Sequence, residues 1–389
     1  MKIGIDCRLF GPKDTGIGRY VQNLVKELLL INPKIEFVLF VRRSFFQENF
    51  HLDLSKLSSH IKFVNADLPH YSWREQLFFP KIIAKEKVDL MHFTHFNVPI
   101  FYRGLFVVTI HDLIKHFFSG PSTTTRSYLL YWLKRLGYFL VFRKAVFKSR
   151  LIFAPSNFVK QQLIEQYNLP SSKVEVTYEG VNQFLNKVGQ KTSNKVLEKY
   201  QVKKPYILYV GNIYPHKNLD NLLTAIGILN KKIGFTVELV VICARNVFSQ
   251  RLSKKVAQKG LKNFVKITGY VSDEDLFLFY RNASCFVFPT LSEGFGLPGL
   301  EAMSLSCPVV CSNIPVLKEI YQKGALYFDP KNPNDIAQKI KEVVTKKELS
   351  KILVKNGKDV VKKYSWQKTA NQTLNSYFKV LKNENSFSL

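Results

Sequence analysis

Two carboxylates, Glu293 and Glu301, are separated by seven residues in the string Ser292-Glu-Gly-Phe-Gly-Leu-Pro-Gly-Leu-Glu-Ala-Met303. The glycines permit a tight loop whose backbone N–H groups can approach a ligand closely. Pro298 suits the first turn of a helix, and a helix start offers unpaired N–H groups and a favourable dipole to an anion. Glu301, on that first turn, could accept two hydrogen bonds from a ribose diol. The string favours a site for a diphosphate and a ribose. The alternative is an ordinary turn with two solvated glutamates.

Two further side chains, one cationic and one titratable, are candidates for a role in chemistry. Lys217 follows a glycine-containing turn after the apolar run Tyr206–Gly211. A fixed cation at this place would stabilise the negative charge of a bound phosphate. His111 is a titratable side chain, and Asp112 beside it could orient its ring or cap a turn. The alternatives are a solvated lysine at a helix start and a histidine that packs in the core.

The string Asp273-Glu-Asp275 spells a D-x-D pattern that can hold a metal ion. Ser272 immediately precedes it and the apolar run Leu276–Tyr280 follows, which is the pattern of a helix N-cap. The sequence has no other cluster of His, Cys and carboxylate residues at the spacing of metal ligands. We therefore predict a cap at Ser272 and chemistry that needs no metal.

Short apolar runs rich in Val, Ile and Phe alternate with longer segments of helical period, which predicts parallel sheets covered by helices on both faces. In the first half the predicted strands are Lys2–Asp6, Glu36–Val41, Val88–His92, Phe106–Ile110, Leu151–Ala154 and Val174–Tyr178, and the predicted helices are Gly16–Leu30, Trp73–Lys85, Arg126–Ala145 and Ser156–Tyr167. In the second half the predicted strands are Tyr206–Gly211, Thr236–Ile242, Phe264–Thr268, Cys285–Pro289, Pro308–Ser312 and Ala325–Phe328.

The chain of 389 residues, 46% of them apolar, suits two domains. We predict an N-terminal Rossmann-like domain over 1–181, a polar, lysine-rich linker over 182–204 and a second Rossmann-like domain over 205–364. The segment 365–389, with helical spacing over Trp366–Leu381, should pack back toward the first domain. Two successive open α/β sheets place a ligand in the cleft between their strand ends.

A formal net charge of +28 calls for an anionic partner. The segment Leu113–Ile164 has nine Lys or Arg residues and no Asp or Glu, and its leucines at 129, 133, 136 and 140 repeat at helical spacing. This pattern fits an amphipathic helix on an anionic membrane surface. The alternative is a leucine stripe that faces the domain core. No run of 18 apolar residues exists, so we expect no membrane span.

Five scattered cysteines without any Cys-x-x-Cys indicate buried apolar residues in a reducing compartment. The first six residues read as a strand and not as a signal peptide. We therefore expect a cytoplasmic protein, peripheral on the inner face of the cell membrane where the basic segment binds lipid.

The string around Glu293 resembles the E-x7-E signature of the family-4 retaining glycosyltransferases. Other segments match that family in order: Ile5–Arg8 with Thr15–Tyr20, the histidine motif Thr109–Leu113, and the phosphate-clamping turn Tyr209–Leu219. The resemblance implies an α/β protein of GT-B fold, with two Rossmann-like, doubly wound parallel-sheet domains that face a cleft. It also implies that the domain over 1–181 binds the acceptor and that the domain over 205–364 binds the nucleotide sugar. The clamp and glycine strings look most like those of mannosyltransferases of surface polysaccharide assembly.

The resemblance also implies roles for individual residues. The catalytic residues would be His111, beside the reacting sugar, Lys217, on the diphosphate, and Glu293, on the sugar. The donor would be bound by Gly16, Gly18, Asn212, Lys217, Gly269, Val271, Glu293, Gly294, Phe295, Gly296, Leu297 and Glu301. In this set the nucleobase of the donor would lie near Gly269–Val271 and its ribose near Glu301. Asn212 stands where many members carry arginine, and His216 or Arg245 could supply the missing cation.

We therefore predict a retaining, metal-independent glycosyltransferase without a cofactor. It would move a sugar, with mannose favoured, from GDP-mannose or a UDP-sugar to a glycan or lipid-linked acceptor. A front-face reaction, in which a donor phosphate oxygen takes the acceptor's proton, is favoured over double displacement with Glu293 as nucleophile. The alternatives are a UDP-glucose-type transferase, another GT-B enzyme and a non-catalytic protein that binds sugar nucleotides. Nucleic-acid binding is disfavoured, because no helix-turn-helix, zinc-finger or RNP signature occurs.

Overall fold

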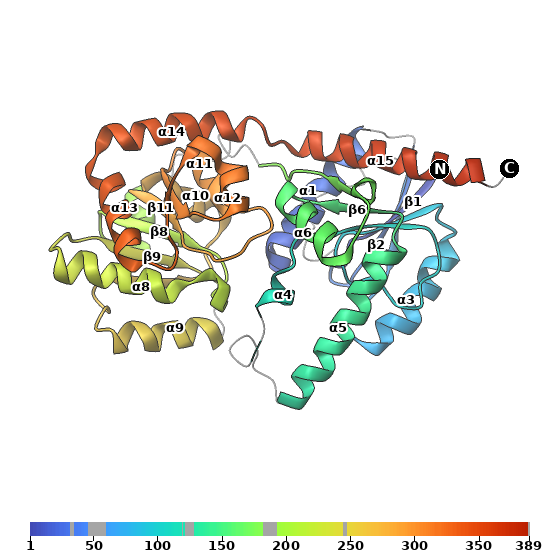
Figure 1. Ribbon diagram of the computed structural model, residues 1–389, viewed down its shortest axis with the longest axis horizontal. Coiled ribbons are helices and arrows are strands. Elements are labelled where there is room, and N and C mark those ends of the chain that lie inside the picture. The colour runs from blue at the N-terminus through green and yellow to red at the C-terminus, as the bar shows by residue number, and fades with distance from the viewer. Residues whose placement is uncertain are drawn as a thin grey trace. The chain divides into compact units, whose positions relative to one another are not determined.

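The computed structural model describes residues 1–31, 35–45, 60–118, 120, 128–181, 193–243 and 247–387 (Figure 1). The chain forms two compact units, each built on a parallel sheet. Unit 1 comprises Met1–Leu113, Thr124–Gly180 and Ser365–Leu389, and unit 2 comprises Ile114–Thr123 and Val181–Tyr364. This arrangement confirms the predicted α/β class with two doubly wound parallel sheets.

The sheet of unit 1 has seven parallel strands in the order β3-β2-β1-β4-β5-β6-β7. The strands are β1 (Lys2–Asp6), β2 (Glu36–Val41), β3 (Ile61–Asn65), β4 (Leu90–Phe93), β5 (Phe106–Thr109), β6 (Leu151–Ala154) and β7 (Val174–Val176). The helices of this unit are α1 (Thr15–Ile31), α3 (Trp73–Glu86), α5 (Tyr128–Lys148), α6 (Asn157–Tyr167) and α15 (Trp366–Phe387). The chain reverses its direction of winding between β1 and β4, which is where open α/β sheets bind ligands.

Each face of the first sheet has its own apolar core. On one face α1 and α15 pack over alternate strand residues such as Ile3 and Ile5. On the other face Phe79 of α3, Phe142 of α5 and Leu163 of α6 pack together. In Figure 1 the red helix α15 lies along α1, although nearly the whole chain separates the two in sequence. The carboxyl-terminal segment is thus part of the core of unit 1.

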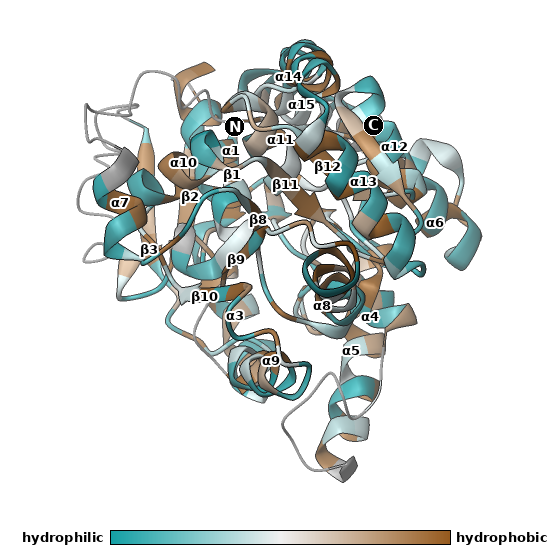
Figure 2. Cartoon of the chain, turned by 90° about the vertical axis from the view of Figure 1, so that its left-hand side faces the viewer, coloured by the Kyte–Doolittle hydropathy of each residue, from teal (hydrophilic) through white to brown (hydrophobic). Residues whose placement is uncertain are grey.

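The sheet of unit 2 has six parallel strands in the order β10-β9-β8-β11-β12-β13, which repeats the winding of the first. The strands are β8 (Tyr206–Val210), β9 (Glu238–Ile242), β10 (Val265–Gly269), β11 (Cys285–Phe288), β12 (Val309–Ser312) and β13 (Ala325–Phe328). The helices are α4 (Ile114–Phe117), α7 (Ser193–Lys199), α8 (Leu219–Gly227), α9 (Val247–Gln258), α10 (Asp273–Asn282), α11 (Leu297–Ser304), α12 (Pro315–Tyr321), α13 (Pro333–Thr345) and α14 (Lys347–Val361). The central strand β11 is brown in Figure 2, because all of its residues are apolar and buried.

The segment predicted as a linker is partly built into unit 2. Its residues 182–192 lie outside the described part of the chain. Beyond them α7 buries Val196 and Leu197, and the ammonium of Lys199 lies 2.7 Å from the carboxylate of Asp275 on α10. The prediction over 193–204 was therefore wrong, because two buried apolar residues in a lysine-rich segment are enough to dock a short helix.

The five cysteines are free and buried, as predicted. Burial raises the pKa of the Cys243 thiol to about 11 and that of the Cys285 thiol further. A thiol with such a pKa stays protonated near neutral pH. These residues therefore serve as small apolar side chains of the cores.

Candidate active site

Two loops of unit 2 meet where the adjacent strands β8 and β11 end. The backbone N–H of Leu291, after β11, donates to the carbonyl of His216, after β8, at 2.7 Å. The buried side chain of Asn218 donates to the carbonyl of Pro289 at 3.0 Å and to that of Pro330 at 2.7 Å. Because these bonds tie the two loops together, side chains carried by both loops share one place at the carboxyl edge of the sheet.

Lys217 and Glu293 are the two side chains that these loops bring together. The ammonium of Lys217 forms a salt bridge with Oε1 of Glu293. Only 15% of the lysine side chain and 11% of the glutamate side chain are exposed. The ammonium also lies 5.5 Å from the ring centroid of Phe288. An ammonium that is largely withdrawn from water attracts an anion more strongly than an exposed one, so this place suits a phosphate.

The loop before α11 owes its shape to Gly296. This residue has φ of +98°, and a Cβ added to it would lie 2.6 Å from the hydroxyl of Tyr321. No side chain caps α11 at this end, so its first N–H groups keep the orientation that favours an anion. Leu297 is the first residue of the helix, and Gly294 precedes the turn. The ring of Phe295 is buried and packs edge-on against Tyr364 at 5.5 Å.

Glu301 lies on α11 and accepts a hydrogen bond of 3.4 Å from the hydroxyl of Tyr280. The helix begins at Leu297, one residue before Pro298. Glu301 is therefore its fifth residue and lies beyond the first turn. The sequence analysis had placed it on the first turn, which was wrong by a small margin because the helix begins one residue earlier. Gly269, with φ of +80°, ends β10 at the same edge of the sheet, and the neighbouring Val271 is buried.

The clamp turn after β8 contains Lys217 as its charged group. Asn212 accepts a hydrogen bond at its carbonyl from the hydroxyl of Tyr209 at 2.7 Å. Burial, with a further contribution from Lys217, lowers the pKa of His216 to about 3. This lowered pKa favours a neutral His216 near pH 7 and leaves Lys217 as the cation of the turn. Arg245 lies outside the described residues.

In unit 1, His111 follows β5 and has both ring nitrogens engaged. Nδ1 lies 3.3 Å from Oε1 of Glu179, and Nε2 lies 3.0 Å from the carbonyl of Thr94. Both partners offer acceptor oxygens, so a ring protonated on both nitrogens would donate to each of them. Burial lowers the pKa of His111, but the hydrogen bond and charge of Glu179 outweigh it and the net pKa is raised. The ring of Tyr20 packs edge-on against it at 4.6 Å.

The glycines Gly16 and Gly18 lie in the first turn of α1, and their surroundings differ. A Cβ on Gly18 would lie 2.0 Å from the carbonyl of Gly11, because the turn before the helix packs there. Gly18 is therefore required by this packing. Nothing lies within 4 Å of the corresponding position on Gly16, which leaves room for another molecule beside the backbone.

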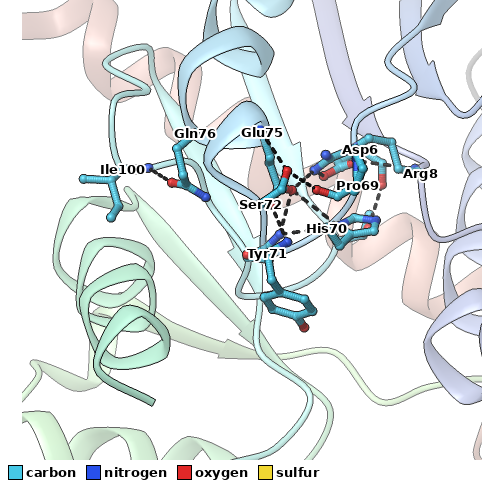
Figure 3. Close-up of polar contacts among 11 residues, drawn as sticks. Asp6, Arg8, Pro69, His70, Tyr71, Ser72, Glu75, Gln76 and Ile100 are labelled. Atoms are coloured by element: carbon cyan, nitrogen blue, oxygen red, sulfur yellow. Dashed lines mark hydrogen bonds and ion pairs between the residues drawn. The ribbon is translucent and has the colours of Figure 1, made fainter. Parts of the chain in front are cut away.

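A buried ionic cluster of unit 1 was missed by the sequence analysis. The guanidinium of Arg8, after β1, pairs with Asp6 at 2.7 Å and with Glu75 of α3 at 2.8 Å, as Figure 3 shows. Arg8 and Glu75 have no exposed surface. Ser72-x-x-Glu75 before the apolar run of α3 is a capping-box pattern, which indicates the helix start but not the pairing of Glu75 with Arg8. Ser72 does cap the helix, accepting from the Glu75 N–H at 3.2 Å.

The D-x-D string is a helix cap, as predicted. The hydroxyl of Ser272 accepts a hydrogen bond from the N–H of Asp275 at 3.3 Å. Asp275 is buried and binds Lys199 and Tyr200. Among the described residues, no group of three His, Cys, Asp or Glu side chains is placed to hold a metal ion.

Two families match successive parts of the chain. The family described as Glycosyltransferase Family 4 matches residues 15–183, and the family described as Glycosyl transferases group 1 matches residues 190–360. O-antigen chain mannosyltransferase B of Escherichia coli is 29% identical over 374 residues, which cover 93% of this chain and 96% of the relative. An uncharacterized glycosyltransferase of Methanocaldococcus jannaschii is 30% identical over 368 residues, which cover 92% of this chain and 93% of that relative.

The fold is also found among solved structures. Sucrose-phosphate synthase from Thermosynechococcus elongatus matches 98% of this chain and 100% of its own with a TM-score of 0.76, at 18% sequence identity. At this identity the likeness shows the fold, which is GT-B. The sequence matches to relatives and families, taken together, cover both units. The chain belongs to glycosyltransferase family 4 and has its GT-B fold.

Proposed function

We propose that this glycosyltransferase moves mannose from GDP-mannose to a glycan or lipid-linked acceptor, with retention and without a metal. The E. coli relative, an O-antigen chain mannosyltransferase that aligns over nearly the whole chain, supports the choice of sugar. The contact between Lys217 and Glu293, at the ends of β8 and β11, carries the proposal. A UDP-sugar is the alternative donor.

Lys217 stabilises the leaving group in this mechanism. The bond between C1 of mannose and the β-phosphate oxygen breaks as the acceptor hydroxyl attacks C1 from the same face. Negative charge then develops on GDP, next to the ammonium of Lys217 and the uncapped start of α11. A phosphate oxygen of the leaving GDP takes the proton of the acceptor hydroxyl, so no protein base is required.

Glu293 contacts the sugar in this proposal and does not attack it. Its carboxylate is paired with Lys217 and mostly buried. A carboxylate that shares its charge with an ammonium is a weak nucleophile, which supports the front-face route over double displacement. When the diphosphate takes over the ammonium, the carboxylate becomes able to accept a hydrogen bond from a sugar hydroxyl.

The remaining roles follow from the family. His111 donates to a hydroxyl of the transferred sugar after exchanging its bond with the carbonyl of Thr94. Glu301 accepts hydrogen bonds from the ribose. The other donor-binding positions act through their backbone or by leaving space, and they are Gly16, Gly18, Asn212, Gly269, Val271, Gly294, Phe295, Gly296 and Leu297.

Two measurements test this function. The mannosyl group of GDP-mannose is α-linked, so retention predicts an α-linkage in the product, which NMR can detect. Activity should survive EDTA. A β-linked product would contradict retention, and activity lost on EDTA and restored by a divalent cation would contradict metal independence. Ligand-induced thermal shifts with GDP and with UDP identify the base, because a ligand at 100 times its Kd adds about 2.7 kcal/mol of stability.

We propose further that α5 rests on an anionic membrane surface on the cytoplasmic side. Leu133 and Leu136 are each 60% exposed and Leu140 is 52% exposed. The helix packs on its core through Val141, Phe142, Ala145 and Val146 instead, so the alternative of a leucine stripe in the core was wrong. The side chain of Leu129 lies outside the described residues. The same helix carries exposed basic residues that would attract anionic lipid headgroups, namely Lys134, Arg143 and Lys148.

No helix in the described ranges has both the length and the apolar content that a membrane span requires. The amino-terminal part of α5 extends beyond the sheet that its other end covers, as the green helix of Figure 1 shows. A helix of this kind buries one face in the headgroup region and leaves the other on the protein. The proposal therefore concerns a protein that lies on the membrane, as a lipid-linked acceptor would require.

A further inference from the structure

Tyr71 has an unusual backbone for a large residue. Its φ is +60°, in the left-handed region that favours glycine, and its side chain is 50% exposed. Residues held in this region cluster at functional sites, where the surrounding structure maintains them. An exposed tyrosine in such a conformation is unexplained by packing, so its surroundings indicate what it serves.

A buried polar network holds Tyr71 in place. Its N–H donates to Oε2 of Glu75 at 2.8 Å, while Oε1 of Glu75 accepts from Arg8 at 2.8 Å and from Asn97 at 2.7 Å. Glu75 is fully buried, and Ser72 caps the helix that carries it. Figure 3 shows these contacts on one side of Tyr71 and its ring pointing away from them. The network fixes the backbone and leaves the ring presented outward.

The same network has polar atoms left over. Within the described part of the chain, Nη1 of Arg8, Oδ1 of Asn97 and Nε2 of His70 have no hydrogen-bond partner. Arg8 and Asn97 are at most 2% exposed. Buried polar atoms in native proteins nearly always pair with protein, ordered water or ligand. These atoms lie behind Tyr71, within the network that fixes its backbone, and a buried water is the partner that suits them.

Tyr71 also lies at the functional edge of the first sheet. Its ring centroid is 6.4 Å from that of His95 and 6.2 Å from that of Phe96, which follow β4. The ring of His95 in turn lies 6.5 Å from that of His111, after β5. Tyr71 thus belongs to the group of side chains around His111.

We infer that Tyr71 binds the acceptor, and that its ring stacks on the apolar face of an acceptor pyranose while neighbouring polar groups bind the hydroxyls. This inference rests on the proposed function and names a binding residue for it. The aromatic face of Tyr71, with His95 and Asp112 beside it, fits a sugar better than an acyl chain, which offers these polar groups no hydrogen bonds.

The experiment is saturation-transfer NMR with methyl α-D-mannopyranoside and the full-length protein. Tyr71→Phe should retain binding. Tyr71→Gly, which accepts φ of +60° without strain, should keep the fold and lose the stacking surface, and we expect binding roughly five- to tenfold weaker. Trp73→Ala is the matched control, because Trp73 is an exposed aromatic residue of the same segment whose ring partner is Phe78. This control should bind like the wild type.

Equal transfer in the wild type and Tyr71→Gly would overturn the inference, as would no transfer to the wild type or an equal loss in Trp73→Ala. The thermal shift of the wild type with GDP and UDP tests the proposed function separately. If a nucleotide binds while pyranoside binding is unchanged in Tyr71→Gly, only the inference fails. If no nucleotide binds, the proposed function fails.

Discussion

At the scale of single residues, Lys217 is the group on which the proposed chemistry depends. It is the cation of the clamp turn, since Asn212 is neutral and His216 has a pKa lowered to about 3. We expect Lys217→Ala to reduce kcat/KM by roughly 100-fold or more, because a preorganised charge at the leaving group is lost. Steady-state kinetics with GDP-mannose measures the effect.

Lys255→Ala is the matched control for this substitution. Lys255 is exposed on α9 and pairs with Asp220, so its removal changes the net charge equally without touching the clamp turn. We expect near wild-type kinetics for this variant. An effect of Lys217→Ala below about threefold, with the fold intact by circular dichroism, would remove Lys217 from the mechanism.

The state of His111 gives a pH-dependent prediction. Its pKa is raised, so the folded protein binds this proton more tightly than the unfolded chain does. The contact with Glu179 therefore stabilises the folded state in full below the ordinary histidine pKa of about 6.5. This stabilisation is lost as the pH rises through the raised pKa of His111. NMR titration should show His111 titrating above about 6.5 and shifting down in Glu179→Gln.

His92 provides the internal comparison in that titration. Burial lowers its pKa to about 3, with a smaller contribution from His111, so its ring should stay neutral from mildly acidic to alkaline pH. A His111 signal that titrates at or below the ordinary value, or that ignores Glu179→Gln, would show that the ring is not held as an imidazolium.

At the scale of elements, α5 makes the membrane proposal measurable. We expect flotation with vesicles rich in phosphatidylglycerol, weakening with added salt because screening shortens the range of charge attraction. Replacing Leu133, Leu136 and Leu140 together by Gln should weaken binding by at least about tenfold, since each leucine loses apolar burial. Vesicles of phosphatidylcholine alone should bind the wild type weakly.

The control for this element uses exposed apolar residues elsewhere. Leu30 of α1 is 50% exposed and Ile352 of α14 is 55% exposed, and changing both to Gln should leave flotation unaltered. If the wild type does not bind the anionic vesicles, or binds them equally at high salt, the proposal that α5 rests on an anionic membrane is wrong.

The elements also show what could be predicted from the sequence. Buried strands such as β1, β2, β6 and β13 were predicted with their observed bounds, because a continuous apolar run is itself the signal. β3 was missed because its residues Ile61–Asn65 are only partly buried. A half-exposed edge strand includes polar residues, here Lys62 and Asn65, so it does not stand out as a continuous apolar run.

The candidate site was predictable to the extent that its residues are local. Lys217 and Glu293 were placed at one ligand from short motifs, and the structure brings them into contact. The pairing of Arg8 with Glu75 was not predicted, because nothing in either segment specifies a partner far along the chain. Tyr71 was missed for the same reason, since its backbone depends on that distant pair.

At the scale of the whole molecule, the chain closes unit 1 last. The helix α15 packs on α1 through Trp366 and Leu374, after the whole of unit 2 has intervened in sequence. Gly180 marks the crossing, because a Cβ there would lie 2.1 Å from the backbone nitrogen of Trp366. The first unit therefore depends on α15 for one face of its core.

A buried hydrogen-bond chain anchors this closing helix. The hydroxyl of Tyr377 lies 2.5 Å from Nδ1 of His92, and Nε2 of His92 lies 2.8 Å from the hydroxyl of Thr109, which also meets Tyr20 at 3.0 Å. Tyr377→Phe should leave a ring nitrogen of His92 buried and unpaired, which costs about 1–3 kcal/mol. Denaturant unfolding measures this loss.

Hydrogen exchange then locates the effect of Tyr377→Phe. Exchange should accelerate in α15, β4 and β5 of unit 1 and stay unchanged in β8 and β11 of unit 2, because local opening follows cooperative units. Tyr178→Phe is the control, since it removes an exposed hydrogen bond with Asn157 and should cost less than about 0.5 kcal/mol. Faster exchange spread equally over both units would contradict the view that α15 stabilises the first unit alone.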